Sequence, residues 1–283
     1  MASFTNFATL SYNGGTTNSN IVTGEILEAL TAVKTAVSAN YSAGDRITYA
    51  LSLVNTGTAA ITDYTVTDNL GGYTVGANTV YPHAYNAGTV RYYINGVLQT
   101  APTVTAGPPL SVTGLTVPAG GNAVLIYETT ATPVAPLATG SSITNTATIT
   151  GGGLTTPITA QATVDTANSA DLTISKALSP TTVTENGRIT YTFVISNTGN
   201  TEATATGNVV VTDTFAPILR NIAVTYNGTA WTEGTNYTYN AATGVFTTLA
   251  GQITVPAASF TQNTDGTFTV TPGTATLVIT GTV

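Results

Sequence analysis

The chain carries two copies of one sequence pattern, and this internal repeat constrains its fold more than any other feature. The first copy contains Lys34, Arg46-Ile47-Thr48-Tyr49 and Asn55-Thr56-Gly57, and the second contains the same residues 142 positions later. Two more pairs of segments correspond at larger offsets: Val66-Thr67-Asp68 with Val211-Thr212-Asp213, and 123–131 with 275–283. Offsets that grow along the chain indicate loops of unequal length between shared strands, so we expect two domains of one fold.

Composition places both copies in the all-β class. Charged residues make up only 7% of the 283 residues, and the abundant threonine, valine, glycine and asparagine are residues of strands and turns. The net charge of −7 and the lack of a basic run exclude the attraction on which nucleic-acid binding depends. The sequence contains no cysteine, and no apolar run long enough for a helix inserted in a membrane.

The motifs of the second copy resemble those of a known family. Asp171 to Lys176, 188–199 and Val211-Thr212-Asp213 are similar to the repeat of Gram-positive and archaeal surface proteins called domain of unknown function eleven. The resemblance implies immunoglobulin-like antiparallel β-sandwiches, used in tandem in surface stalks and fibres, without catalytic activity on a substrate. We therefore expect an N-terminal donor segment at 1–24 and sandwiches at 25–167 and 168–283. The helix-like run 25–30 is then a linker into a first strand.

Several apolar rows on the predicted strand faces each contain one polar residue. These residues are Lys34 and Lys176, Asp68 and Asp213, and Asn145. Because burying an unpaired charge costs several kcal/mol, the lysine, aspartate and asparagine of one domain should be buried together. Gram-positive pilins and adhesins, which these sandwiches resemble, join such a lysine and asparagine by an isopeptide bond. The resemblance therefore suggests a bond between Lys34 and Asn145, promoted by Asp68.

The chemistry of such a bond follows from burial. Burial lowers the pKa of a lysine and raises that of an aspartate, so a neutral amine can attack the asparagine carbonyl while the protonated acid polarises it. Ammonia then leaves. The alternative interpretation is a solvated lysine, a turn-capping aspartate and an asparagine bonded to nearby backbone. The only two lysines, Lys34 and Lys176, stand at equivalent positions, which favours the cross-link.

The second copy ends at Val283, before the counterpart of the segment 142–164 that closes the first copy. The N-terminal run 3–12 aligns with 142–151, so that Asn6 falls on Asn145. Its residues on one face are Phe4, Asn6, Ala8 and Leu10. The run can fold back onto its own second domain, or complete the second domain of another copy as a donor strand. We expect the second arrangement because the whole first domain separates the two segments, and Asn6 would then meet Lys176 and Asp213 of the neighbour and form an intermolecular isopeptide bond.

The sequence thus predicts a structural subunit of an extracellular fibre on a cell or spore surface, polymerising with itself head to tail. It predicts no cofactor and no metal, since the single histidine, His83, lies beside Pro82 in what we expect to be a surface loop. No signal peptide is visible after Met1. The alternative function is a monomeric surface adhesin or carbohydrate-binding module. Its aromatic platform would use either Tyr92 and Tyr93, or Trp231, Tyr237 and Tyr239.

Overall fold

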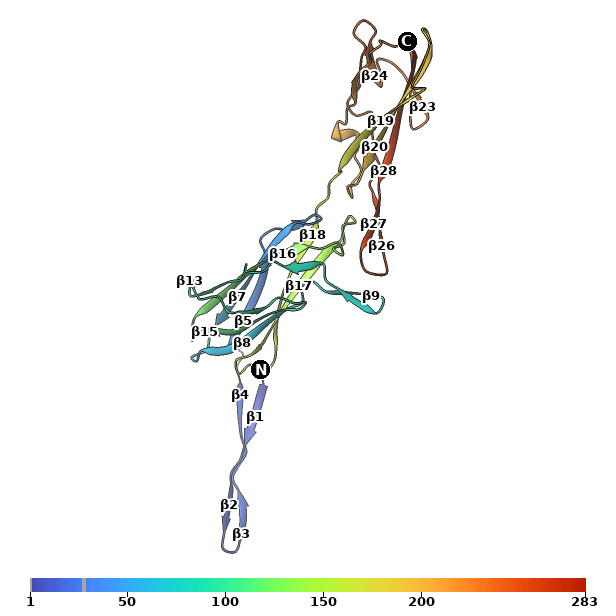
Figure 1. The fold of residues 1–283 in the computed structure, drawn as a ribbon. Coiled ribbons are helices and arrows are strands. Elements are labelled where there is room, and N and C mark those ends of the chain that lie inside the picture. The colour runs from blue at the N-terminus through green and yellow to red at the C-terminus, as the bar shows by residue number, and fades with distance from the viewer. Residues whose placement is uncertain (1, 27–28) are drawn as a thin grey trace. The chain divides into compact units, whose positions relative to one another are not determined.

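The computed structural model describes residues 2–26 and 29–283, and nearly all of its regular structure is β-strand (Figure 1). The described residues include one short 3₁₀ helix, Ala205–Gly207. The chain forms two compact units: unit 1 contains Met1–Ala135 and Ser142–Asp165, and unit 2 contains Pro136–Ser141 and Thr166–Val283. The expected all-β class of immunoglobulin-like antiparallel sandwiches is confirmed. Residues 27 and 28 of the predicted linker lie outside the described residues.

Unit 1 is a sandwich of two antiparallel sheets. Sheet 1A has the order β13 (Val97–Leu98), β12 (Arg91–Ile94), β16 (Asn122–Ala131), β7 (Arg46–Asn55) and β5 (Leu30–Ala36), and β11 (His83–Tyr85) also pairs with β16. Sheet 1B has the order β14 (Thr103–Thr105), β15 (Leu110–Val117), β8 (Ile61–Asp68), β17 (Ser142–Gly151), β18 (Ile158–Thr166) and β6 (Asn40–Tyr41). A separate hairpin joins β9 (Tyr73–Val75) and β10 (Asn78–Val80).

Alternating side chains of the two sheets form the core of unit 1. Every second residue of β16 from Ala123 to Ala131 is buried, because successive side chains of a strand point to opposite faces. The predicted apolar rows of β8 and β17 are buried as well, including the polar residues Asp68 and Asn145. The phase predicted for these strands is therefore confirmed.

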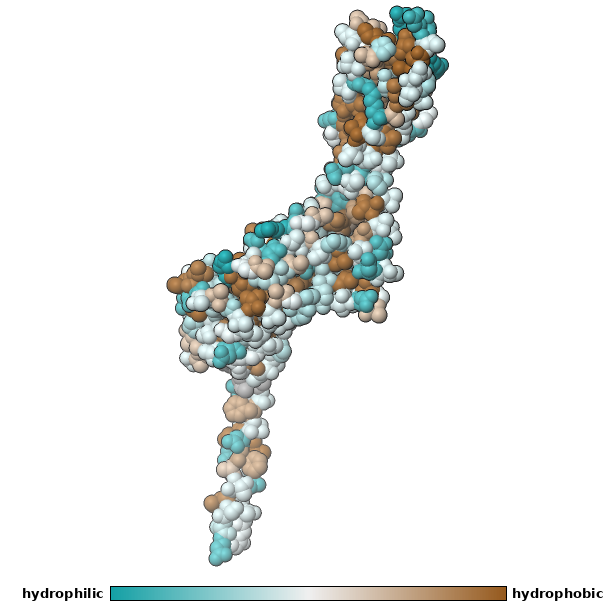
Figure 2. Space-filling model, in the orientation of Figure 1, coloured by the Kyte–Doolittle hydropathy of each residue, from teal (hydrophilic) through white to brown (hydrophobic). Residues whose placement is uncertain are grey.

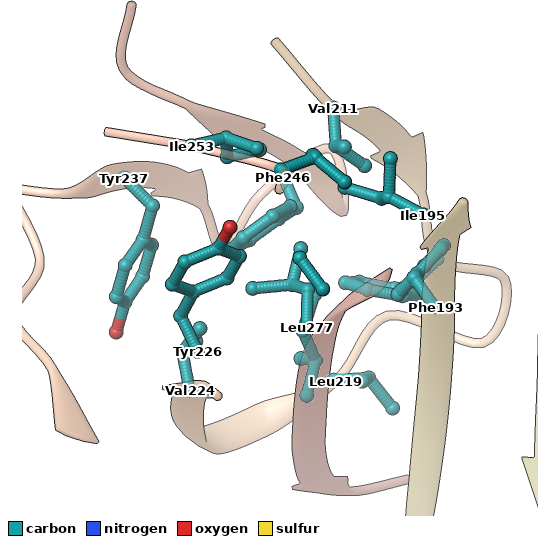
Figure 3. Packing of buried hydrophobic residues seen from close by; sticks show 14 of the residues in the cluster. Phe193, Ile195, Val211, Leu219, Val224, Tyr226, Tyr237, Phe246, Ile253 and Leu277 are labelled. Carbon is teal, nitrogen blue, oxygen red and sulfur yellow. The ribbon is translucent and has the colours of Figure 1, made fainter. Parts of the chain in front are cut away.

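Unit 2 repeats much of this arrangement. Its larger sheet has the order β19 (Leu172–Ser179), β20 (Arg188–Asn197), β28 (Gly273–Thr282), β22 (Arg220–Tyr226) and β23 (Thr229–Trp231). A smaller sheet has the order β21 (Thr212–Thr214), β25 (Val245–Thr248) and β24 (Tyr237–Asn240), and a hairpin joins β26 (Ser259–Gln262) and β27 (Phe268–Thr271). Apolar side chains from both sheets, among them Phe193, Phe246 and Leu277, pack into one core (Figure 3).

The Asn-Thr-Gly motif of each copy fastens a loop to the end of its sandwich. Asn55 Nδ2 donates to the carbonyl oxygens of Ala59 at 2.9 Å and Pro118 at 3.0 Å. Asn197 makes the same two bonds, to Thr201 at 2.8 Å and Pro256 at 3.0 Å. In both copies the side-chain oxygen accepts from the glycine of the motif at 2.9 Å. The two copies therefore share these hydrogen bonds as well as the sequence motif.

The N-terminal segment forms a long two-stranded hairpin. In it β1 (Ala2–Asn6) pairs with β4 (Val22–Ile26), and β2 (Thr9–Tyr12) pairs with β3 (Gly15–Asn18) next to the turn at Asn13-Gly14. In the described part of the chain, these four strands pair only with one another. The run 3–12, predicted as a donor strand, is thus one half of a hairpin. An isolated two-stranded hairpin is marginally stable in water.

Candidate cross-linking sites and acceptor face

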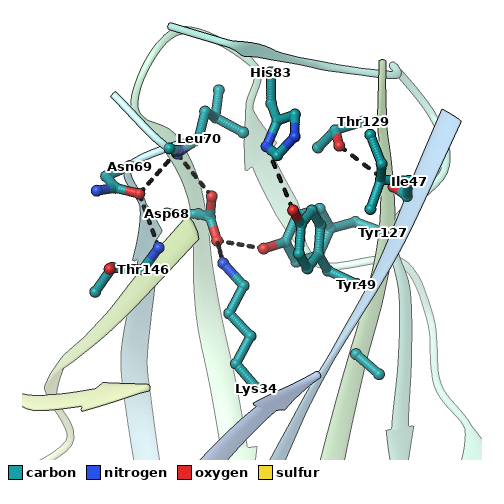
Figure 4. A network of polar contacts seen from close by, with 12 residues as sticks. Lys34, Ile47, Tyr49, Asp68, Asn69, Leu70, His83, Tyr127, Thr129 and Thr146 are labelled. Atoms are coloured by element: carbon teal, nitrogen blue, oxygen red, sulfur yellow. Dashed lines mark hydrogen bonds and ion pairs between the residues drawn. The ribbon is translucent and has the colours of Figure 1, made fainter. Parts of the chain in front are cut away.

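Unit 1 holds a lysine–aspartate ion pair in its core. Lys34 projects from β5 of sheet 1A and Asp68 from the end of β8 in sheet 1B, and their side chains are 0% and 1% exposed. Lys34 Nζ lies 2.5 Å from Asp68 Oδ2 (Figure 4). The backbone N–H of Leu70 donates to the other carboxylate oxygen at 2.9 Å. The ion pair therefore joins the two sheets in the absence of solvent.

Two tyrosines enclose this ion pair. Tyr49 and Tyr127 pair across β7 and β16, their rings stack with centroids 5.8 Å apart, and Lys34 Nζ lies 4.8 Å from the Tyr49 centroid. The Tyr127 hydroxyl donates to Asp68 Oδ2, the oxygen that also holds Lys34. Burial lowers the pKa of Lys34 from 10.5 to about 8, although Asp68 opposes this change. At neutral pH the neutral, nucleophilic form of the amine is therefore far more populated than in a solvated lysine.

Asn145 is buried beside the tyrosines and lacks hydrogen-bond partners. It is 0% exposed, and neither its Nδ2 nor its Oδ1 makes a hydrogen bond of regular geometry. Its amide is nevertheless close to the hydroxyls of Tyr49 and Tyr127: burial raises the pKa of both, and the nearby amide partly opposes the rise. A buried polar group without a partner costs about 1–3 kcal/mol. Stability of the fold alone does not account for this amide.

The prediction that His83 lies in a surface loop is wrong. His83 begins β11 and is 1% exposed, and its Nδ1 lies 3.5 Å from the Tyr49 hydroxyl. Burial lowers its pKa to about 4, with Asp68 and Lys34 acting in opposite directions. The sequence pattern does not predict the short strand β11. Its pairing with the long strand β16 brings His83, directly after Pro82, into the core.

Unit 2 contains the equivalent ion pair, but solvent reaches it. Lys176 Nζ contacts Asp213 Oδ2, and their side chains are 39% and 18% exposed. Tyr191, the counterpart of Tyr49, lies under the amine with its centroid 4.4 Å from Nζ. Tyr191 pairs with Ile279 where Tyr49 pairs with Tyr127. Among the described residues of unit 2, no asparagine takes the position of Asn145.

The face of unit 2 that carries Lys176 is open, and we name it the acceptor face. It consists of the side chains of β19 that face the smaller sheet, which nothing in the described residues covers, and of the free edge of β21. Ile174 and Leu178 are 54% and 38% exposed, and an apolar hollow beside them is lined by Leu172 and 209–211. Hydrophobic residues gather on the visible surface of this unit in Figure 2. In the described chain, β21 pairs only with β25, whereas its counterpart β8 pairs with both β15 and β17.

The β1–β4 part of the N-terminal hairpin has the strand register of the hairpin that covers this face in unit 1, whereas β2–β3 is displaced by one residue. Corresponding pairs are Ser142 with Asp165 and Ser3 with Glu25, and Asn145 with Ala162 and Asn6 with Val22. The two antiparallel pairs therefore place an asparagine at the same position. The side chains that β17 buries correspond to Phe4, Asn6, Ala8 and Leu10, which are all exposed in the hairpin.

The two hairpins also match in side-chain volume at one cross-strand pair. In unit 1 the buried pair is Ile143 with Val164, and in the N-terminal hairpin the corresponding pair is Phe4 with Gly24. The Phe4 ring lies over Gly24, where an added Cβ would come within 2.4 Å of Phe4 Cζ. Within the N-terminal hairpin, the large Phe4 side chain thus lies opposite a glycine that leaves room for it, as in a packed core.

The aromatic residues of the alternative binding function mostly belong to the cores. Tyr92 and Tyr237 are 5% and 4% exposed, and Trp231 stacks on Tyr226 at 4.8 Å between centroids. Tyr92 and Tyr237 are therefore not available for a platform, whereas Tyr93, Trp231 and Tyr239 are half-buried. No cluster of three or more acidic, histidine or cysteine side chains suited to a metal ion occurs in the described residues. Within the same residues, no helix has the length and hydrophobicity needed to cross a membrane.

No protein-family model and no curated protein sequence matches the chain. Solved structures do show likeness. BcpA, the major pilin subunit of Bacillus cereus, matches with 14% identity and a TM-score of 0.36 over 96% of this chain and 73% of its own. The pilus backbone RrgB from Streptococcus pneumoniae matches with 14% identity and a TM-score of 0.36 over 86% and 55%. The N-terminal domain of the Streptococcus gordonii adhesin Sgo0707 matches with 13% identity and a TM-score of 0.35 over 47% and 31%. At these identities the likeness concerns the fold alone.

Proposed function

We propose that the chain is a structural subunit of an extracellular fibre, in which the N-terminal hairpin of one copy covers the acceptor face of unit 2 in the next copy. One observation carries the proposal. Strands β1 and β4 repeat the register of the first part of β17–β18, with β2–β3 displaced by one residue, and unit 2 exposes the face that β17–β18 cover in unit 1. Because the donor and the acceptor lie in different units of each chain, an assembly of any length retains one free donor at one end and one free acceptor at the other. Such contacts that do not close on themselves give an open filament.

The pairing in unit 1 specifies how the donor would dock. There, Ala147 pairs with Asp68 and Ile149 with Val66. Transferred to unit 2, β1 and β2 would lie along the free edge of β21, with Ala8 beside Asp213 and Leu10 beside Val211. Leu10 would then fill the apolar hollow. Backbone hydrogen bonds along the edge would supply affinity, and the alternating side chains would supply specificity.

Exposed apolar side chains provide the driving force for docking. Phe4 is 54% exposed, Leu10 64% and Val22 55% in the isolated hairpin. Covering the exposed parts of these three side chains is worth about 1 kcal/mol each at ordinary transfer free energies. The acceptor face contributes the exposed surfaces of Ile174 and Leu178 as well. Burial of these side chains therefore favours the joined state.

The ion pair and the unpaired amide of unit 1 support an intramolecular cross-link. The proton of the Lys34 ammonium would pass to Asp68, and the neutral amine would attack the Cγ of Asn145. A new C–N bond forms, the bond from Cγ to Nδ2 breaks, and Asp68 returns its proton to the leaving group. The products are an isopeptide bond and ammonia. The second proton that the Lys34 nitrogen loses leaves with the ammonia, as an ammonium ion. The Asn145 amide then no longer stands unpaired in the core.

The same reaction in unit 2 would make the fibre covalent. A docked hairpin would bring Asn6 to the position that Asn145 has in unit 1, next to Lys176 and Asp213 of the neighbouring copy. Docking would also remove solvent from this pair, which is part exposed in the single chain. The intermolecular bond between Lys176 and Asn6 would therefore form only after assembly.

Electron microscopy and denaturing gels of the full chain test both parts of this proposal. We expect filaments, and a ladder of multimers that survives boiling in denaturant. Leu10→Asp should abolish filaments, whereas Thr9→Asp, on the opposite strand face, should permit them. Asn6→Ala should leave filaments that fall to monomers on boiling, and Thr5→Ala should keep the ladder. A native chain that stays monomeric, or a Leu10→Asp chain that assembles normally, would contradict the proposal.

A further inference from the structure

The Tyr127 hydroxyl contacts the reacting carboxylate of unit 1, and no part of the cross-linking scheme so far uses it. It donates to Asp68 Oδ2, and the Asn145 amide lies beside both this hydroxyl and that of Tyr49. We propose that Tyr127 and Tyr49 are catalytic residues of the Lys34–Asn145 cross-link and hold the Asn145 oxygen as it gains negative charge. This inference rests on the cross-link proposed above.

The arrangement permits the Tyr127 proton to change partner during the reaction. While Asp68 is ionised, its Oδ2 accepts both from Lys34 and from Tyr127. When the Lys34 proton moves to Asp68, that oxygen becomes a donor, and the Tyr127 hydroxyl is released to donate elsewhere. The amine then adds to Cγ of Asn145, and the electron pair of the carbonyl double bond moves onto Oδ1. A tyrosine hydroxyl that turns to this oxygen would stabilise it in a site buried from solvent.

Both tyrosines remain protonated donors throughout. Burial is the main cause that raises the pKa of each, and the charge of Asp68 raises it further. His83 Nδ1 lies 3.5 Å from the Tyr49 hydroxyl. The same burial keeps the imidazole neutral, with a pKa of about 4. A neutral imidazole can orient the hydroxyl of Tyr49 without adding a second positive charge beside Lys34.

Unit 2 provides a natural comparison within the same chain. It keeps the lysine, the aspartate and one tyrosine, as Lys176, Asp213 and Tyr191, but has Ile279 where unit 1 has Tyr127. An isoleucine offers no donor to the carboxylate or to an incoming asparagine. The unit 2 site therefore lacks one of the two hydroxyls, and its reaction with Asn6 should be the slower of the two.

The test measures how fast newly made full chain loses ammonia. Chain synthesised by cell-free translation is quenched in denaturant at timed intervals, and the joined peptide containing Lys34 and Asn145 is quantified by mass spectrometry. Tyr127→Phe, which keeps the ring but removes the hydroxyl, should slow the reaction on the order of 100-fold, the usual cost of one lost donor to an oxyanion. Tyr226→Phe, which removes a hydroxyl bonded to a loop carbonyl of unit 2, is the matched control and should leave the rate unchanged.

A pH profile separates chemistry from packing. Because the Tyr127 hydroxyl donates to the carboxylate that exchanges a proton with Lys34, its loss should change the dependence of the rate on pH. A variant that merely packs badly would melt at lower temperature without moving this profile. Equal rates and equal profiles for the native chain and Tyr127→Phe would overturn the tyrosine role and leave the cross-link standing. A native chain that never loses ammonia would overturn both, and filament formation would then be judged by microscopy alone.

Discussion

Replacing Asn145 by alanine should remove the cross-link of unit 1 and reveal how much it stabilises the sandwich. The bond would join β5 of sheet 1A to β17 of sheet 1B and close a loop of about 110 residues. A cross-link that closes a loop of this length lowers the conformational entropy of the unfolded chain. This raises the free energy of the unfolded chain by about 4.7 kcal/mol at 25 °C. For a unit of this size we expect the melting temperature of unit 1 to fall by about 10–20 °C.

The assay measures thermal unfolding of the full chain by calorimetry, and mass spectrometry gives the intact mass of each sample. Asp68→Asn should also block the reaction, because it keeps the Asn145 amide but removes the acid that promotes it, and it should destabilise unit 1 further by leaving Lys34 buried without its partner. Thr144→Ala is the control, since Thr144 lies on the same strand and points to solvent. Both reaction-blocking variants should retain the ammonia that the native chain loses.

The result that would refute this reasoning is specific. If Asn145→Ala and the native chain melt at the same temperature, the two strands are not joined. The same holds if the native chain shows the full mass expected from its sequence. If instead Asn145→Ala destabilises unit 1 and Asp68→Asn does not, the effect belongs to local packing at Asn145.

Three more predictions follow from individual side chains. His83 binds a proton near pH 6.5 when unfolded but only near pH 4 when folded, so unit 1 should lose about 3 kcal/mol of stability between these values as the pH falls; denaturant titrations of His83→Gln should lack this loss. Gly24→Val should push the Phe4 ring away and reduce filament formation in micrographs, whereas Thr23→Val should not. Asn55→Ala should lower the free energy of unfolding of unit 1 by about 3 kcal/mol in denaturant titrations, since it removes three hydrogen bonds of a buried side chain, worth about 1 kcal/mol each.

The sequence alone determined the repeat, the all-β class and the phase of the strands. These properties are local: side chains alternate along a strand, so a row such as 143–149 can be assigned to one face without knowledge of what lies opposite. The rarity of lysine made Lys34 and Lys176 conspicuous, and the aspartates could be found by their place in the repeat. The structure then placed each lysine against the aspartate of its own copy.

The tertiary structure decided which groups surround those pairs. Tyr127 and His83 are separated from Lys34 by long stretches of chain, and only the pairing of β16 with β7 and β11 brings them together. The same holds for the N-terminal hairpin, where the match with β17–β18 appears only when β4 is paired with β1. Sequence periodicity fixes the face to which a side chain points, whereas its neighbours across a sheet or a core depend on register between distant segments.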